Sequence, residues 1–218
     1  MLSIITSMAL HGLDGYAVSV QVDVSSGMQC FEIVGLPDVS VKESKERVKT
    51  AIKNSGVEFF SRRVIVNLAP ANTKKEGSIF DLPIAIGILI AMEAVSKNSA
   101  ERRLENTIVI GELSLGGKIC KVNGVLPICI EAAKLGIKRV ILPKENAKEA
   151  AVVKNIEILP AENLVQVMNY LNETEQIPQE NPIEFETKNL SNYMIDFSEV
   201  KGQENAKRAL EIAAARST

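Results

Sequence analysis

Residues 63–89 read RVIVNLAPANTKKEGSIFDLPIAIGIL, and this stretch decides the fold. It begins with Val64–Leu68, an apolar run of the right length for a central strand. A polar turn follows, and Ser78 with Asp81 has the spacing of a capping box. The helix expected over 80–96 is apolar almost all round, which is typical of a core helix. The stretch therefore predicts a sheet with a buried helix packed on it.

The residues before this stretch predict more strands and one helix. The valines at 18, 20, 22 and 24 alternate with polar residues, so one face of their strand is expected to be buried. Ser40 and Glu43 form another capping-box pattern, at the start of a helix that ends near Ser55. The strands expected in this region are Leu2–Leu10, Tyr16–Val24 and Phe31–Val34.

The residues after it alternate between strands and helices. We expect a hairpin around Gly116-Gly117 and helices near 125–135, 146–152 and 161–171. The strands expected here are Thr107–Ile110, Lys118–Val122, Arg139–Leu142 and Ile156–Leu159. This order predicts an α+β domain over residues 1–172, with a mixed β-sheet and packed helices. Residues 173–195 are polar and acidic and read as a linker, and residues 196–218 read as the start of a further module.

Composition restricts the classes of function. The net charge of −2 gives no global attraction to nucleic acid, so any such contact needs a local patch. His11 is the only histidine, so the sequence offers very little for a histidine-based triad or a multi-histidine metal site. Cys30, Cys120 and Cys129 show no C-x-x-C spacing and are expected to be buried, reduced thiols. With no signal-type N-terminus and no apolar run of about 20 residues, we expect a soluble, cytoplasmic protein without membrane contact.

One cluster of cations could bind an anion. Lys74 and Lys75 precede the expected helix start at Ser78, where free backbone N–H groups favour negative charge. Arg62 and Arg63 could extend the same patch, and any DNA contact is expected through these four cations. Alternatively, Ser78 and Asp81 already satisfy the N–H groups and the lysines are solvated.

Two further groups of charged residues give weaker evidence for a binding site. The cations of residues 42–53 lie near carboxylates at helical spacing, so internal pairs such as Glu43 with Arg47 are favoured over a nucleic-acid stripe. Glu32, Asp38 and Glu112 lie at strand or turn ends, but no metal-ligand spacing joins them. We expect no metal site.

The segment Asp196–Ala215, DFSEVKGQENAKRALEIAAA, resembles the opening of an AAA+ ATPase module. In that family a Val-x-Gly-Gln turn lies beside the nucleotide base, which makes Val200, Gly202 and Gln203 candidate base contacts. The phosphates are held by a later glycine-rich loop with Lys-Ser/Thr, and these 218 residues contain no G-x-x-x-x-G-K-[ST]. The chain itself is therefore expected to bind no cofactor, while ATP and Mg²⁺ are implied for a full-length protein.

Nearly the whole chain resembles the N-terminal part of the magnesium-chelatase-like AAA+ family, of the YifB or ComM type. Three runs carry the resemblance: FEIVGLPDVSVKESKERVKTAIKNSG with the stretch quoted first, GELSLGGKICKVNGVLPICIEAAKLGIKRVILP, and the terminal segment. More distantly, the same runs are similar to the proteolytic domain of Lon, a ribosomal S5 domain 2-like fold. Its activity needs a serine nucleophile and a lysine base. Alignment places Ile79 and Leu126 at these positions, so the dyad is expected to be absent.

The resemblance implies a ring ATPase, expected to be a hexamer, with this domain as a non-catalytic accessory piece. In the ComM type the ATPase is a DNA helicase that promotes branch migration during natural transformation. The alternatives are a chelatase-like remodeller of a protein partner, or a residual Ser–Lys peptidase in which Ser78 pairs with Lys118 or Lys121. Whether this chain is itself an enzyme depends on that pairing. The sequence gives neither the DNA structure, nor the protein partner, nor the ring size.

Overall fold

The computed structural model describes residues 1–12, 14–59, 62–183 and 199–215. The chain divides into two units, Met1–Ile183 and Glu184–Thr218.

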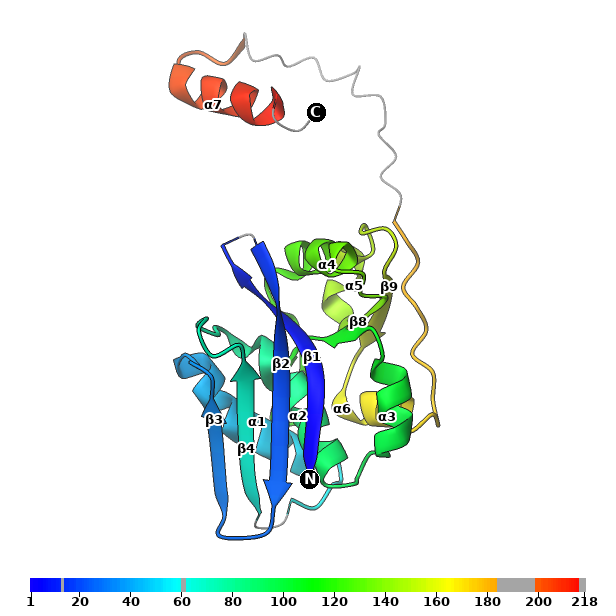
Figure 1. Cartoon of the computed structure of the whole chain (residues 1–218). Coiled ribbons are helices and arrows are strands. Elements are labelled where there is room, and N and C mark those ends of the chain that lie inside the picture. The colour runs from blue at the N-terminus through cyan, green and yellow to red at the C-terminus, as the bar shows by residue number, and fades with distance from the viewer. Residues whose placement is uncertain (13, 60–61, 184–198, 216–218) are drawn as a thin grey trace. The chain divides into compact units, whose positions relative to one another are not determined.

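The first unit is built on a four-stranded sheet with the order β1-β2-β4-β3 (Figure 1). β1 and β2 are antiparallel, as are β2 and β4, whereas β3 runs parallel to β4. The strands are β1 (Leu2–His11), β2 (Asp14–Ser25), β3 (Cys30–Val34) and β4 (Arg63–Ala69). The expected central position of β4 is confirmed.

Two helices, α1 (Val39–Asn54) and α2 (Asp81–Ala91), pack on one face of this sheet. Every residue of α2 is buried, which confirms the predicted core helix. The helix lies close against β1 and β2 because Gly87 has no side chain: a Cβ there would stand 2.6 Å from Cγ2 of Val22. The Ser3 hydroxyl donates to the Gly87 carbonyl at 2.7 Å and fixes the same contact.

A second layer is a parallel sheet of β5 (Thr107–Val109), β8 (Arg139–Pro143) and β9 (Glu157–Ala161), in the order β5-β8-β9. A hairpin does form around Gly116-Gly117, between β6 (Glu112–Leu113) and β7 (Ile119–Cys120). Its expected first strand, Thr107–Ile110, is wrong, because β5 pairs in parallel with β8 instead. The helical segments of this half are α3 (Lys97–Leu104), α4 (Val125–Lys134), η2 (Lys144–Asn146), α5 (Ala147–Ala150) and α6 (Leu164–Leu171). The unit is therefore an α+β fold with mixed sheets and packed helices.

The helix expected over 80–96 is wrong in its bounds and its cap. A 3₁₀ turn, η1 (Ser78–Phe80), precedes α2, and no side chain caps either. The chain leaves the helix after Ala91 and turns at Glu93, where φ is +63°. α3 follows and was not predicted, because Ala100 is its only buried residue and its apolar pattern is weak.

The capping box predicted at Ser40 is also wrong. The N-cap of α1 is Asp38, whose carboxylate accepts from the Val41 N–H at 2.7 Å. Asp38 follows Pro37 directly, so the helix starts as soon as the chain leaves the turn after β3. The expected Glu43–Arg47 pair is present at 3.8 Å, one turn apart on α1.

The compact unit runs past the expected limit at residue 172. Ile177 is 4% exposed, the Glu180 N–H donates to the Ile158 carbonyl, and the Ile183 N–H donates to the Ala151 carbonyl. These contacts attach the first part of the predicted linker to β9 and α5. The rest of that linker, to residue 195, lies outside the described residues.

The second unit contains α7 (Glu204–Ala215), in which no residue is buried. The helix expected at the end of the chain is thus present. Within the described ranges, no helix combines the length and apolar character needed to cross a membrane.

Candidate functional site

A cavity of about 430 Å³ lies where η1, β6 and the start of α4 meet. Gly77, Ser78 and Ile79 line one side, and Glu112, Lys121 and Asn123 are among the residues that line the rest. The alignment with a Ser–Lys dyad points to this region, because Ile79 lies in η1 and Leu126 lies in α4. The cavity is therefore the candidate site to test.

Ser78 has a carboxylate partner in this cavity. Its hydroxyl donates to Oε2 of Glu112. Lys118 is occupied elsewhere, since its ammonium donates to Glu145 at 2.8 Å, and the exposed Lys121 makes no hydrogen bond to Ser78 among the described residues. A serine hydroxyl needs a base within hydrogen-bond reach to become a nucleophile. The arrangement supplies no lysine in that role.

The two aligned dyad positions hold side chains that cannot exchange protons. Ile79 is 8% exposed and joins the hydrophobic core, while its carbonyl accepts from the Gly111 N–H at 2.9 Å. Leu126 lies in the first turn of α4, where its N–H donates to Glu149 at 3.2 Å. Both residues therefore hold the backbone around the cavity without contributing a reactive group.

A buried charge joins the elements that support the cavity. Asp81 is fully buried and accepts from Ser44 Oγ, from Arg47 Nε at 2.7 Å and from the Leu113 N–H at 3.2 Å. These bonds connect α2 with α1 and with the β6–β7 hairpin. Burial raises the pKa of the Asp81 carboxyl, although Arg47 and Ser44 oppose the shift. Sequence reasoning took Asp81 for a cap; its position as the lone charge in an apolar helix was the available signal.

The four predicted cations do not form one surface. Lys75 is fully buried, and its ammonium donates to the carbonyls of Pro70 and Thr73. Burial lowers the pKa of Lys75. Lys74 forms an ion pair with Glu76 at 2.7 Å.

Arg62 and Arg63 are exposed and lie at the opposite end of β4 from the lysines. A strand of this length spans roughly 20 Å, which separates the two pairs. The structure therefore brings together Arg62 with Arg63 and Lys74 with Lys75, but not one pair with the other.

The candidate base contacts lie in the second unit. Val200 is 40% exposed, and Gly202 and Gln203 both have positive φ, at +70° and +59°. The chain therefore bends directly before α7, and the nucleotide-base contact that the resemblance implies stays a prediction. In the part of the chain that the structure describes, no three His, Cys, Asp or Glu side chains are grouped to hold a metal ion.

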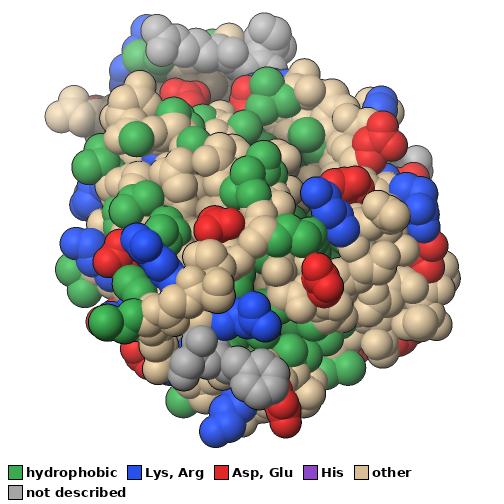
Figure 2. Space-filling model, turned by 60° about the horizontal axis from the view of Figure 1, so that its bottom comes forward, with side chains coloured by type: hydrophobic (Ala, Val, Ile, Leu, Met, Phe, Trp, Pro, Cys, Tyr) green, Lys and Arg blue, Asp and Glu red, His purple; other side chains and the backbone are tan. Residues whose placement is uncertain are grey.

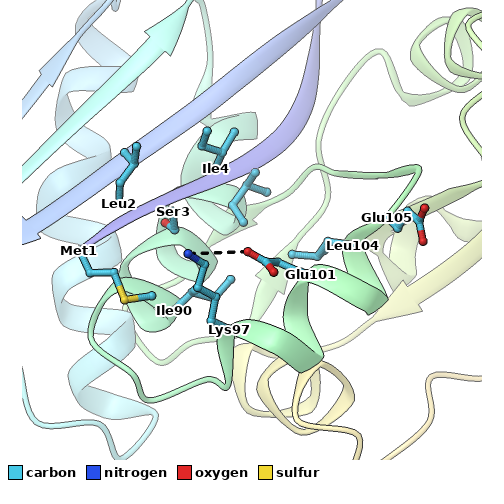
Figure 3. A pocket seen from close by; sticks show the side chains of 10 residues that line it. Met1, Leu2, Ser3, Ile4, Ile90, Lys97, Glu101, Leu104 and Glu105 are labelled. Carbon is cyan, nitrogen blue, oxygen red and sulfur yellow. Dashed lines mark ion pairs between the residues drawn. The ribbon is translucent and has the colours of Figure 1, made fainter.

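A second cavity, of about 550 Å³, lies between β1 and α3 (Figure 3). Its lining is mostly apolar and includes Met1, Ile4, Ile90 and Leu104, and an ion pair of Lys97 with Glu101 at 3.8 Å lies beside it. The Ser3 hydroxyl in its lining is bonded to α2. The lining therefore offers an apolar contact surface and no activated nucleophile.

The expectation that all three cysteines are buried is wrong. Their different burial predicts different reactivity of the three thiols. Only Cys129 is buried, and burial raises its pKa to about 12. Because the thiolate is the reactive form, we expect native protein at mildly alkaline pH to react with a disulfide reagent at Cys30 and Cys120 alone. Titration with and without denaturant checks this, with Cys120→Ser as the control that removes one native-state thiol. Three thiols reacting at one rate in native protein would contradict the burial of Cys129.

Comparison with known proteins identifies the family. Residues 20–146 match the family described as Subunit ChlI of Mg-chelatase. The chain is 38% identical to the competence protein ComM of Haemophilus influenzae over 98% of its own length and 42% of that protein. It is 36% identical to the uncharacterized protein YifB of Escherichia coli, over 98% of the chain and 41% of YifB.

A Lon protease of Azorhizobium caulinodans is more distant, at 25% identity over 77% of the chain and 20% of that protease. The chain spans about two-fifths of the length of ComM and YifB. The Lon match covers most of the first unit, in agreement with the α+β architecture. The chain belongs to the Mg-chelatase subunit ChlI family, as a relative of ComM and YifB.

Proposed function

We propose that this chain is a non-catalytic accessory domain of a cytoplasmic, ring-forming AAA+ ATPase that acts on DNA in the manner of a branch-migration helicase. The observation that carries the proposal is the similarity to ComM, a competence protein, along 98% of the chain. The accessory role is supported by Ile79 and Leu126 at the dyad positions and by the Ser78 hydroxyl bonded to Glu112.

The ATPase itself would depend on residues that these 218 do not include. Val200, Gly202 and Gln203 would lie beside the nucleotide base, while a phosphate loop elsewhere would hold the phosphates and Mg²⁺. The bend before α7 is compatible with such a role, because Val200 and Gln203 are both exposed among the described residues. ATP hydrolysis would then drive motion of the ring along DNA.

The test is a DNA-stimulated ATPase assay on the full-length protein. We expect branched DNA to raise the rate of ATP hydrolysis above the rate without DNA. The 218-residue chain is the control and should show no micromolar ATP binding by calorimetry, because it has no phosphate loop. An ATPase rate that ignores DNA would contradict the proposed helicase function.

A second function is favoured by the match to the Mg-chelatase subunit. In this alternative, the ring would use ATP to remodel a protein partner, and its activity would respond to that partner and not to DNA. The same assay separates the two functions, since only the first predicts stimulation by nucleic acid.

A further inference from the structure

β1 is an edge strand of the four-stranded sheet. It pairs with β2 on one side, and within the described residues no strand of that sheet pairs with its other side. At the start of the ladder, the Met1 ammonium donates to the Val24 carbonyl at 2.5 Å, and the Val24 N–H donates to the Met1 carbonyl at 3.3 Å. In an antiparallel ladder, such hydrogen-bonded pairs alternate with pairs that make no hydrogen bond to each other. Every second residue from Met1 onwards is therefore bonded to β2.

Leu2 and Ile4 have backbone groups that point away from β2. Ser3 and Ile5 make the bonds to β2, whereas no hydrogen bond engages the N–H or C=O of Leu2 or Ile4 in the part of the chain that the structure describes. An edge of this kind is a template for pairing with another chain, and proteins often block it with charges or proline. Residues 2–6 read LSIIT and contain neither. The first half of β1 is therefore an open, unprotected edge.

The open edge borders a groove whose other wall is α3. The cavity of about 550 Å³ is lined by residues 1–5 on the side of β1, by Ile90, and by Leu104 among the residues of α3 (Figure 3). Figure 2 views the molecule from the side at which β1 begins and shows hydrophobic side chains in several places, with charged ones among them. An extended peptide beside an edge strand can bond to its main chain while alternate side chains fill pockets. The groove has both features.

The charges that line the groove favour a basic segment. Lys97 and Glu101 form an ion pair at 3.8 Å. Glu105 is exposed, and its carboxylate makes no ion pair among the described residues, since Arg139 donates to its main-chain carbonyl instead. One cation in the lining thus stands against two carboxylates. Figure 3 shows Glu105 beyond Ile4, at the end of the groove away from Met1. This end is complementary to a Lys or Arg side chain.

We propose that the groove between β1 and α3 binds an extended segment of a protein partner, which adds to the sheet as a strand antiparallel to β1. Its main chain would bond to Leu2 and Ile4, and its alternating apolar side chains would pack over Ile90 and Leu104. A Lys or Arg at its N-terminal end would lie beside Glu105. The antiparallel direction is chosen because antiparallel pairing is slightly more stable per residue than parallel pairing. The inference rests on this geometry and not on the proposed function.

The first test titrates a fluorescent peptide, an arginine followed by alternating valine and threonine, into the 218-residue chain and follows anisotropy. Ile4→Pro removes the N–H that points into the groove and no bond to β2, because proline is tolerated where an edge strand has its N–H free. Ile4→Ala loses the same side chain but keeps the N–H. We expect Ile4→Pro to bind the peptide at least ~10-fold more weakly than Ile4→Ala. Equal affinities of the two variants, with both folded by circular dichroism, would overturn the proposal.

Amide hydrogen exchange tests the pairing without any substitution. In the free chain, the Ile4 amide should exchange faster than the amides of Ser3 and Ile5, which are bonded to β2. Saturating peptide should slow the exchange of Ile4 at least ~10-fold, because its N–H then bonds to the added strand. An unchanged exchange rate of Ile4 in the presence of bound peptide would show that the peptide lies elsewhere.

A charge reversal tests the orientation. Glu105→Lys should weaken binding of the arginine peptide roughly 3-fold or more and strengthen binding of a peptide with glutamate in that place. Glu46→Lys is the matched control, because Glu46 is an exposed glutamate on α1 without an ion pair among the described residues, and it should change neither affinity.

Three further outcomes would overturn the proposal. They are equal effects of the two charge reversals, failure of the parent chain to bind the arginine peptide, and a dimer of the parent chain that Ile4→Pro dissociates. In the last case the occupant of the edge would be a second copy of this chain and not a partner segment. Sedimentation of the parent and of Ile4→Pro over a range of concentrations detects such a dimer.

Discussion

Replacing Arg47 with methionine is expected to lower the free energy of unfolding by about 3–5 kcal/mol, because it leaves Asp81 as a buried charge without its ionic partner. Methionine keeps most of the aliphatic stem, so the loss reports on the charge and not on packing. Arg47 bonds both carboxylate oxygens of Asp81, and Nη2 also donates to the Ser40 carbonyl at 3.1 Å. Urea unfolding followed by circular dichroism measures the change.

Arg102→Met is the control, because the Arg102–Glu173 pair has a similar length, 2.9 Å, but an arginine side chain that is 60% exposed. Exposed pairs contribute little, so this variant should unfold near the parent midpoint. The double variant Arg47→Met/Asp81→Asn should recover part of the loss, since it removes the uncompensated charge. Equal effects of Arg47→Met and Arg102→Met would refute the role assigned to the buried pair.

The loss of unfolding free energy in Arg47→Met should change with pH in one direction. Burial holds the pKa of Asp81 above its ordinary value, and Arg47 is one of the groups that oppose the shift. A carboxyl with a raised pKa in the folded chain binds its proton more tightly there than in the unfolded chain. Its contribution to stability therefore falls as the pH rises from its pKa in the unfolded chain to its pKa in the folded chain. Removing Arg47 widens that interval. The deficit of Arg47→Met should therefore shrink as the pH is lowered from neutral.

The sheet and the core helix could be predicted because their signals are local. The alternating valines of β2 and the apolar run of α2 each fix which residues are buried, whatever else the chain does. β6 and β7, with two residues each, and α3, with one buried residue, have no comparable pattern. Their positions depend on contacts with α2, α6 and neighbouring turns.

The site residues were harder to predict because their partners are distant in sequence. Asp81 and Arg47 are 34 positions apart, and so are Ser78 and Glu112. A capping box is the simplest local explanation of Ser78 and Asp81, but the structure uses both side chains for these long-range bonds instead. The dyad positions, in contrast, were assigned by alignment and stay a prediction: Ile79 lines the cavity, whereas Leu126 lies in the first turn of α4 and is not among the lining residues.

Lys74 and Lys75 are adjacent in the sequence, but their side chains should contribute very differently to stability. Lys75→Ala is expected to destabilise the chain by about 2–4 kcal/mol, because the carbonyls of Pro70 and Thr73 lose their buried donor and the stem leaves a void. Lys74→Ala removes an exposed ammonium paired with Glu76 and should leave the unfolding midpoint almost unchanged. Urea unfolding of both variants gives the comparison.

The buried ammonium also predicts how the Lys75→Ala deficit responds to pH. Burial lowers the pKa of Lys75 from 10.5, so the folded chain holds this proton less tightly than the unfolded chain does. The contribution of Lys75 to stability therefore rises with pH between the lowered folded-state pKa and 10.5, and the deficit of Lys75→Ala should widen over that interval. An unchanged unfolding midpoint for Lys75→Ala would contradict the structural role of the buried ammonium.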